Sequence, residues 1–135
     1  MGRYWFDRVF IALIPVDYDD CFEAAIKSAA GDDLEIIKNE IKSGECVAFS
    51  FSGSNYDFKV VLRVEKIADK NELVLVLGAG HGMKYAIKDL LHFAKVNKCH
   101  TIRTHVKSRG LVKIWESLGF EIKETVLSYG RQIQE

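Results

Sequence analysis

Three alternating glycines, Gly78, Gly80 and Gly82, separate an apolar segment from a segment with helical periodicity. Glycine adopts backbone conformations that other residues avoid, so this run predicts a tight turn over residues 78–82. The first amides of a helix lack partners within the helix and lie at its positive end, where they attract anions. The turn is therefore a candidate phosphate site, although the same glycines would be needed if they only permitted a tight turn.

The segments on either side of these glycines predict a parallel unit. Residues 73–77 are consecutive apolar residues, too few for a helix, and indicate a strand buried on both faces. The segment after the turn has helical periodicity, with lysines on the face opposite its apolar residues. Those apolar residues are Ile87, Leu90, Leu91 and Ala94. A β-branched segment over residues 101–106 indicates a second strand, and the three elements form a right-handed parallel unit.

The first third of the chain predicts a strand followed by two helices. Residues 4–14 are aromatic and β-branched, which favours a strand. A helix capped by Asp17 is expected to run through residue 30. A second helix, capped by Asp32 or Asp33, is expected to end at Gly44. The residues expected to be buried are Phe22, Ala25, Ile26 and Ala29 in the first helix and Leu34, Ile37 and Ile41 in the second.

Alternating residues predict two further strands, over residues 45–52 and 58–67, which form an antiparallel meander with the apolar strand. A turn is expected at residues 69–71. After the parallel unit, residues 109–118 predict a short helix and residues 120–129 one or two final strands. The residues expected to be buried in this helix are Leu111, Ile114, Trp115 and Leu118. We expect a single domain over residues 1–135 of the α/β class, with one mixed, mostly antiparallel sheet and helices on both faces.

The composition is that of an ordinary soluble protein without charge bias. Hydrophobic residues make up 48% and charged residues 28% of the chain, and 19 basic residues balance 19 acidic ones, whereas a nucleic-acid-binding surface would need a basic excess. Cys21, Cys46 and Cys99 are widely spaced, which argues against a disulfide framework or a zinc site. No apolar run approaches the roughly 18 residues of a membrane span, and no signal peptide is recognisable. We therefore expect a cytoplasmic protein that binds neither metal, nor membrane, nor nucleic acid.

The order of elements around the glycines resembles the cofactor-binding half of the GNAT (Gcn5-related) N-acetyltransferases. The resemblance is closer to the short GNAT-like proteins of tailed bacteriophages. In those proteins, a Gly-Gly-x-Gly-Met-like turn follows the apolar strand and a Gly-Arg-x-Gly-Trp-like element precedes the last helix. The counterparts here are residues 78–83 and Ser108-Arg109-Gly110-Leu111. The element order matches over nearly the whole chain, and the residue matches are confined to residues 72–120.

The resemblance implies an acyl-CoA-dependent N-acetyltransferase, with acetyl-CoA as the small-molecule acyl donor and an amine of an unknown small molecule or protein as the acceptor. In the family, the strand before the turn pairs with the pantetheine arm and the amides of the turn hold the pyrophosphate. The counterparts here are Leu75, Val76 and Leu77 for the strand, Gly78, Gly80, His81, Gly82 and Met83 for the turn, and Ser108 where family enzymes place a pantetheine-binding Asn.

Two side chains are candidates for the catalytic base that removes a proton from the amine. Glu72 lies where many family members keep a carboxylate, and His105 ends the strand that splays from the apolar one. Each also has a simpler interpretation, as a charged residue at a strand start and as a hydrogen-bonded histidine at a strand end. His81 in the turn would place a cation near the phosphates, or is only an exposed turn residue.

The chain departs from the family at positions that matter for catalysis. Leu77 stands where the family usually carries Arg or Gln, and the glycines are shifted by one residue relative to the family turn. Trp115 stands where many enzymes place the Tyr that protonates the departing thiolate, and tryptophan has no titratable proton. The alternative is therefore a catalytically degenerate GNAT-fold phage protein that binds a host or virion protein, in the host cytoplasm or in the virion. Oligomerisation is open in both cases.

Overall fold

The computed structural model of the chain describes residues 13–52, 56–105, 109–117 and 119–121. The chain divides into two compact units, residues 1–105 and residues 106–135. Among the described residues, the first unit contains the sheet and the helices α1, α2 and α3, and the second contains the helix α4. The expectation of a single domain over residues 1–135 stays a prediction.

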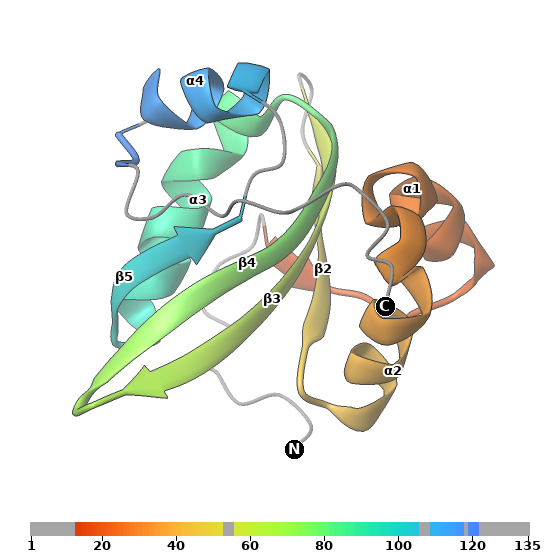
Figure 1. Ribbon diagram of the computed structural model, residues 1–135, viewed down its shortest axis with the longest axis horizontal. Coiled ribbons are helices and arrows are strands. Elements are labelled where there is room, and N and C mark those ends of the chain that lie inside the picture. The colour runs from red at the N-terminus through yellow and green to blue at the C-terminus, as the bar shows by residue number, and fades with distance from the viewer. Residues whose placement is uncertain (1–12, 53–55, 106–108, 118, 122–135) are drawn as a thin grey trace, which may run out of the picture. The chain divides into compact units, whose positions relative to one another are not determined.

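The first unit is built on a five-stranded sheet whose strands lie side by side in the order of the sequence (Figure 1). The strands are β1 (Leu13–Pro15), β2 (Val47–Ser52), β3 (Asp57–Ile67), β4 (Lys70–His81) and β5 (Cys99–Thr104). The first three pairs are antiparallel, and the β4–β5 pair is parallel. This confirms the predicted mixed, mostly antiparallel sheet. Most of the strand predicted over residues 4–14 lies outside the described residues.

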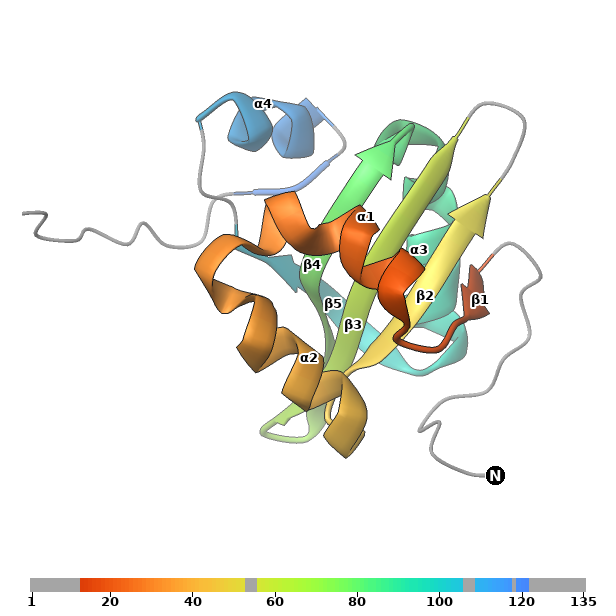
Figure 2. The ribbon, with the colours of Figure 1, turned by 90° about the vertical axis from the view of Figure 1, so that its right-hand side faces the viewer.

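Helices cover both faces of this sheet, as predicted (Figure 2). On one face lie α1 (Asp20–Ala30) and α2 (Leu34–Ser43), joined by the 3₁₀ turn η1 (Gly31–Asp33), and on the other lies α3 (Met83–Val96). Phe22 and Ile26 of α1 form a core with Val61 of β3. On the other face, the Phe93 ring of α3 packs edge to face on Phe49 of β2, with the ring centroids 5.3 Å apart. The sheet therefore carries apolar side chains on both faces.

The first helix begins later than predicted. Asp19, not Asp17, is the N-cap, and its Oδ1 accepts a hydrogen bond from the Phe22 N–H at 2.8 Å. The buried residues of α1 are Phe22, Ile26 and Ala30, whereas the predicted Ala25 and Ala29 are exposed. Because burial stabilises in proportion to apolar area, the two large side chains decide which face turns inward and the alanines follow.

The second helix follows the prediction. It begins after Asp33 and ends at Gly44, which has the left-handed φ of 89° that glycine adopts at helix ends. Ile37 is buried, and Leu34 and Ile41 are partly buried against the same core. The apolar spacing of this helix was therefore sufficient to predict its inward face.

The buried face of α3 is rotated relative to the predicted one, so that it includes Phe93. Its buried residues are Ile87, Leu90, Phe93 and Ala94. Leu91, which we predicted to point inward, is 52% exposed. The aromatic contact between Phe93 and Phe49 explains the difference, because it buries more apolar area than Leu91 would.

The second unit contains α4 (Arg109–Ser117). Trp115 is buried, as predicted, and its ring meets the Phe120 ring edge to face with centroids 4.7 Å apart. Ile114 is 47% exposed, contrary to our prediction, because neighbouring helical residues point about 100° apart. Residues 120 and 121 are not in a strand, and the rest of the strands predicted over residues 120–129 lies outside the described residues. The side chains of Leu111 and Leu118 lie outside them as well.

Candidate functional site

Strand β4 runs through the glycines that we predicted to form a turn. It extends from Lys70 to His81, well beyond the predicted 73–77, and only Gly82 lies between β4 and α3. The residues Gly78, Ala79 and Gly80 pair with Val60, Lys59 and Phe58. The prediction of a turn over residues 78–82 was wrong because β3 continues alongside and hydrogen-bonds to this stretch. The turn predicted at residues 69–71 is likewise shorter, since β4 already begins at Lys70.

Close packing against β3 accounts for two of the glycines. A Cβ atom on Gly78 would come within 2.7 Å of the Phe58 ring, so the ring lies directly on the bare backbone. A Cβ atom on Gly80 would overlap the carbonyl oxygen of Asp57, and its φ of +126° is one that glycine adopts readily. Gly78 and Gly80 are therefore explained by the approach of two strands, without any ligand.

A bulge in β4 lies directly after the point at which β5 ends. Leu77 pairs with Val61 of β3 and Leu75 pairs with Leu62, so Val76 is an extra residue between them. A bulge bends the strand and strengthens its twist. Val76 and Leu77 both pack against the core under α1, so two successive side chains lie on one face. The bulge therefore changes the direction of the second half of β4.

Beyond this bulge, β4 forms an edge of the sheet on its β5 side. The β4–β5 register ends with Leu75 opposite Thr104, whose Oγ1 donates a hydrogen bond to the Leu75 carbonyl at 3.2 Å. Within the described residues, no strand pairs with residues 76–81 on that side. A ligand with amide groups can add to such an edge as another strand would.

The edge leads directly to the start of α3 (Figure 1). Gly82 is the N-cap, with a left-handed φ of 84°, and its carbonyl accepts a hydrogen bond from the Tyr85 N–H at 2.9 Å. Met83 and Lys84 contribute the first two amides of the helix, and its first turn contains no acidic residue. His81 is exposed beside this turn. An anion at this position would meet the helix amides and the exposed side chain of Lys84.

The predicted base Glu72 lies at the other end of β4. His81 lies nine positions further along the chain, which corresponds to about 30 Å along a strand. Its side chain is 17% exposed. Thr101 Oγ1 donates a hydrogen bond to Glu72 Oε2 at 2.9 Å, and Arg103 Nε lies 3.5 Å from Oε1. Both carboxylate oxygens of Glu72 therefore already have a partner.

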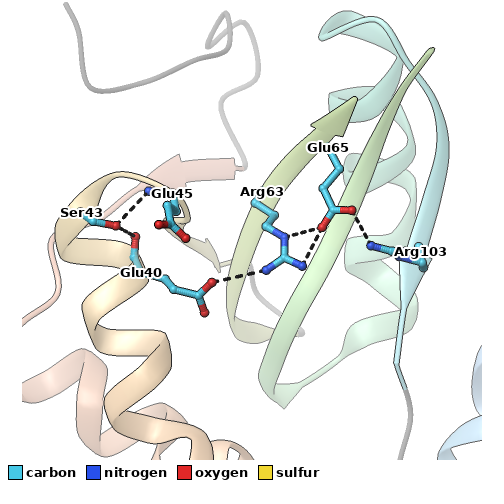
Figure 3. Close-up of polar contacts among 6 residues, drawn as sticks. All are labelled: Glu40, Ser43, Glu45, Arg63, Glu65 and Arg103. Carbon is cyan, nitrogen blue, oxygen red and sulfur yellow. Dashed lines mark hydrogen bonds and ion pairs between the residues drawn. The ribbon is translucent and has the colours of Figure 1, made fainter. Parts of the chain in front are cut away.

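Glu72 belongs to a network of charges that was not predicted from the sequence. Figure 3 shows the part of this network that runs from Glu40 to Arg103. Glu65 lies opposite Glu72 in the β3–β4 pair, and Arg103 Nη2 lies 2.8 Å from Glu65 Oε1. Arg63 Nη2 lies 2.6 Å from Glu65 Oε2, and Arg63 Nη1 reaches Glu40 of α2 at 3.5 Å. The alternation of Arg63 and Glu65 along β3 was the only signal in the sequence. The network joins α2 to three strands.

Glu65 is the centre of this network, and its carboxyl makes the stability depend on pH. Burial raises the pKa of Glu65, but the hydrogen bonds and charges of Arg63 and Arg103 outweigh it, so the pKa lies below its usual range. The stabilisation is therefore complete above the usual pKa of a glutamate and is lost as the pH falls through the lowered pKa.

We expect Glu65→Gln to lower the free energy of unfolding by about 1 kcal/mol at pH 7, a small value because the groups are about one-third exposed. Urea unfolding of both proteins measured from pH 7 to pH 3 checks this, and Glu35→Gln on exposed α2 surface is the matched control. The difference from wild type should shrink at low pH for Glu65→Gln. A difference that persists unchanged at pH 3 would contradict the assignment.

The second predicted base, His105, directly follows β5 where the two strands separate. It is exposed. It lies four positions beyond Thr101, the partner of Glu72, which corresponds to about 13 Å along a strand. The structure therefore does not bring Glu72 and His105 together. His105 is the one of the two that lies at the free edge of β4.

Two further features bear on the site. Ser108 lies outside the described residues. A surface cavity of about 340 Å³ lies between the C-terminal end of α2 and the start of β2, and no predicted site residue lines it. Cys46 is in its lining, where burial raises the pKa of the thiol to about 11. The cavity is thus separate from the edge of β4.

Two kinds of feature are absent from the described residues. No group of three His, Cys, Asp or Glu side chains there is arranged to hold a metal ion. In the same part of the chain, no helix combines the length and the apolar character needed to cross a membrane.

Several solved acetyltransferases resemble this structure. An acetyltransferase of Trypanosoma brucei matches with a TM-score of 0.57 and 14% identity, over 88% of this chain and 98% of that chain. An aminoglycoside acetyltransferase from an uncultured soil metagenomic sample, solved in complex with sisomicin, matches with a TM-score of 0.57 and 12% identity, over 90% and 95%. The glucosamine-6-phosphate N-acetyltransferase of Arabidopsis thaliana matches with a TM-score of 0.52 and 10% identity, over 87% and 97%. No family model and no curated protein matches the sequence.

At these identities the likeness concerns the fold. It extends over most of this chain and nearly all of each neighbour. It also agrees with the element order on which the resemblance was based. The chain has the fold of the GNAT acetyltransferases.

Proposed function

We propose that this protein is an acyl-CoA-dependent N-acetyltransferase, which moves the acetyl group of acetyl-CoA to an amine. The observation that carries the proposal is the edge of β4 beyond the Val76 bulge, which leads to the N-terminus of α3. The acetyltransferases among the structural neighbours support it.

Acetyl-CoA fits this arrangement by its chemistry. Its pantetheine arm carries amide groups, which would pair with the backbone of Val76 and Leu77 as a strand does. Its pyrophosphate would bind the amides of Gly82, Met83 and Lys84 at the start of α3. Leu75 would contribute less, because its carbonyl already accepts a hydrogen bond from Thr104. Contacts of the cofactor with Gly78, Gly80, His81 and Ser108 stay predictions.

The reaction forms one C–N bond and breaks one C–S bond. Bound acetyl-CoA supplies the acetyl group as a reactive thioester. The amine nitrogen attacks the acetyl carbonyl carbon and loses a proton, and the sulfur leaves and takes a proton. We propose that His105, which lies at the edge of β4, accepts the proton of the amine. Glu72 is the second candidate, because its carboxylate oxygens already contact Thr101 and Arg103. Trp115 cannot supply the second proton, which we assign to solvent.

The test is release of free CoA thiol from acetyl-CoA in the presence of amines. The panel should begin with aminoglycosides and glucosamine 6-phosphate, because the names of two structural neighbours identify these as their substrates. We expect thiol release that depends on one class of amine, and mass spectrometry should find that amine acetylated. Binding of acetyl-CoA without acetylation of any amine across a broad panel would contradict the catalytic part of the proposal.

His105→Ala is expected to lower kcat by about 100-fold, the usual contribution of a general base, without changing the affinity for acetyl-CoA. The measurement is thiol release at saturating donor, paired with calorimetry of donor binding. His100→Ala, at an exposed histidine on the strand that His105 follows, is the matched control and should keep full activity. Unaltered turnover in His105→Ala would remove this residue from the mechanism.

The second candidate is a catalytically degenerate GNAT-fold protein that acts by binding a host or virion protein. Leu77 and Trp115, which replace residues that enzymes of the family use, favour it. This protein would bind no acyl donor and release no thiol. A phage origin, inferred from the resemblance alone, remains a prediction.

A further inference from the structure

Charge is distributed unevenly over the two faces of the sheet, although the chain as a whole has no net charge. Residues 17–45, which include α1 and α2, contain nine acidic and three basic residues, a net charge of −6. Residues 83–98, which include α3, contain four lysines and one aspartate, a net charge of +3. Because α1 and α2 cover one face of the sheet and α3 covers the other, the two helical layers carry opposite charge (Figure 2).

The outer face of α3 carries an apolar side chain between two lysines. Leu91 is 52% exposed, and the exposed residues Lys88 and Lys95 lie three positions before it and four positions after it. Residues at these spacings are neighbours on the surface of a helix. Within the described residues, neither lysine forms a salt bridge. The one acidic residue of α3, Asp89, is hydrogen-bonded to the Tyr56 hydroxyl. We call Lys88, Leu91 and Lys95 the basic patch.

The turn from α1 into α2 carries the opposite arrangement. Ile36 is 59% exposed, and Asp32 and Asp33 lie four and three positions before it, in the 3₁₀ turn that leads into α2. Glu35 directly precedes Ile36, and all three acidic side chains are exposed. No basic residue occurs over residues 28–37. We call Asp32, Asp33, Glu35 and Ile36 the acidic patch.

We infer that the basic patch of one copy of this protein binds the acidic patch of a second copy. Each patch has an exposed apolar side chain among charges of one sign, so Leu91 and Ile36 bury each other while the charges around them pair. The protein itself presents the complement of each patch, at a concentration equal to its own. The contact uses no residue assigned to donor binding or catalysis, so it does not depend on the proposed function.

The positions of the two patches determine how the copies assemble. The patches belong to helices on opposite faces of the sheet, so the contact joins two different surfaces (Figure 2). A copy that has bound one partner through α3 therefore keeps its acidic patch for the next copy. Such a contact adds copies head to tail, into rings or open chains, whereas a contact through a two-fold axis stops at the dimer.

The first experiment is sedimentation equilibrium of the full-length wild-type protein over a range of concentrations. In about 0.1 M salt the average mass should rise with concentration beyond twice the 15.3 kDa of one chain. In about 1 M salt it should fall back to one chain, because the Debye length shortens from about 10 Å to about 3 Å. A mass of 15.3 kDa in both salts at millimolar protein would overturn the inference.

Two neutralised variants then separate the patches. Lys88→Gln/Lys95→Gln removes the charge of the basic patch, and Asp32→Asn/Glu35→Gln removes two charges of the acidic patch. Each variant alone should stay monomeric, because each has lost one half of the contact. Mixed in equal amounts, the two should form a one-to-one complex that stops at the dimer, since each variant contributes the intact patch that the other lacks.

Lys66→Gln/Lys70→Gln is the matched control. These lysines are exposed in the hairpin that joins β3 to β4, and the variant changes the net charge by the same amount. It should associate as wild type does. Leu91→Gln should weaken the association about 10-fold and leave the Tm unchanged, because this side chain is half exposed in the monomer.

Three further results would each overturn the inference. They are wild-type association that stops at the dimer, association that persists in both neutralised variants, and a mixture of the two variants that stays monomeric although their Tm values equal that of wild type. Recovery of binding in the mixture would instead confirm that both variants are folded, because each must then supply an intact patch.

Discussion

Gly82→Asp is expected to weaken acetyl-CoA binding by at least about 100-fold relative to Gly82→Asn. Asparagine and aspartate have the same shape, and both tolerate the left-handed backbone that Gly82 adopts. The aspartate adds a negative charge where the proposed pyrophosphate binds. Two like charges about 4 Å apart repel by about 4 kcal/mol near a protein surface, and salt screening leaves an effect of roughly 2.7 kcal/mol.

The same pair of variants controls for folding. Aspartate at a helix N-cap stabilises the helix, so Gly82→Asp should melt no lower than Gly82→Asn. Calorimetry with acetyl-CoA and thermal denaturation of both variants are the measurements. Equal affinity in the two variants would show that no phosphate lies at the start of α3.

Gly80→Ala is expected to destabilise the fold by about 3 kcal/mol or more, which corresponds to a drop in Tm of about 10 °C. The new Cβ atom would overlap the carbonyl oxygen of Asp57 and come within 2.9 Å of the Phe58 Cα. These are backbone atoms of the adjacent strand, so they yield only if β3 and β4 separate. The φ of +126° adds strain for any residue other than glycine.

Gly44→Ala is the matched control for this effect. Gly44 also has a positive φ, +89°, but a Cβ atom there would have nothing within 4 Å. Gly44→Ala should lower the free energy of unfolding by only about 1 kcal/mol, from backbone strain alone. Chemical denaturation of the two variants measures the difference. An equal loss in both would contradict the close approach of β3 and β4 at Gly80.

The sequence predicted the elements whose signals are local. The order of strands and helices, the mixed sheet and the inward face of α2 all follow from apolar spacing within one segment and from caps such as Gly44. These features depend on neighbours in the chain, which a sequence displays directly.

The extent of β4 could not be predicted in this way. Alternating glycines predict a turn when only local conformation is considered. Here pairing with β3 determines the conformation of these residues, because Phe58 covers Gly78 and the Asp57 carbonyl leaves no room for a side chain at Gly80. The bulge at Val76 also depends on the register with β3, which five consecutive apolar residues do not reveal.

The candidate site was predicted only in part, because some of its contacts join residues that are far apart in the chain. The turn residue Gly82 and the strand-end His105 lie at opposite ends of the free edge of β4, as expected from the order of elements. The partners of Glu72 were missed, because Thr101 and Arg103 come from another strand and reach it only through the register of β5.

The most direct test of the account is a calorimetric titration of acetyl-CoA into the wild-type protein, with thermal denaturation alongside. We predict binding at micromolar strength, about −8 kcal/mol. Acetyl-CoA at 100 times its Kd should stabilise the fold by about 2.7 kcal/mol and raise the Tm accordingly. The absence of both binding heat and a change in Tm at millimolar acetyl-CoA would contradict the account. The protein would then share the acetyltransferase fold without using its donor, and a protein partner would be the ligand to seek.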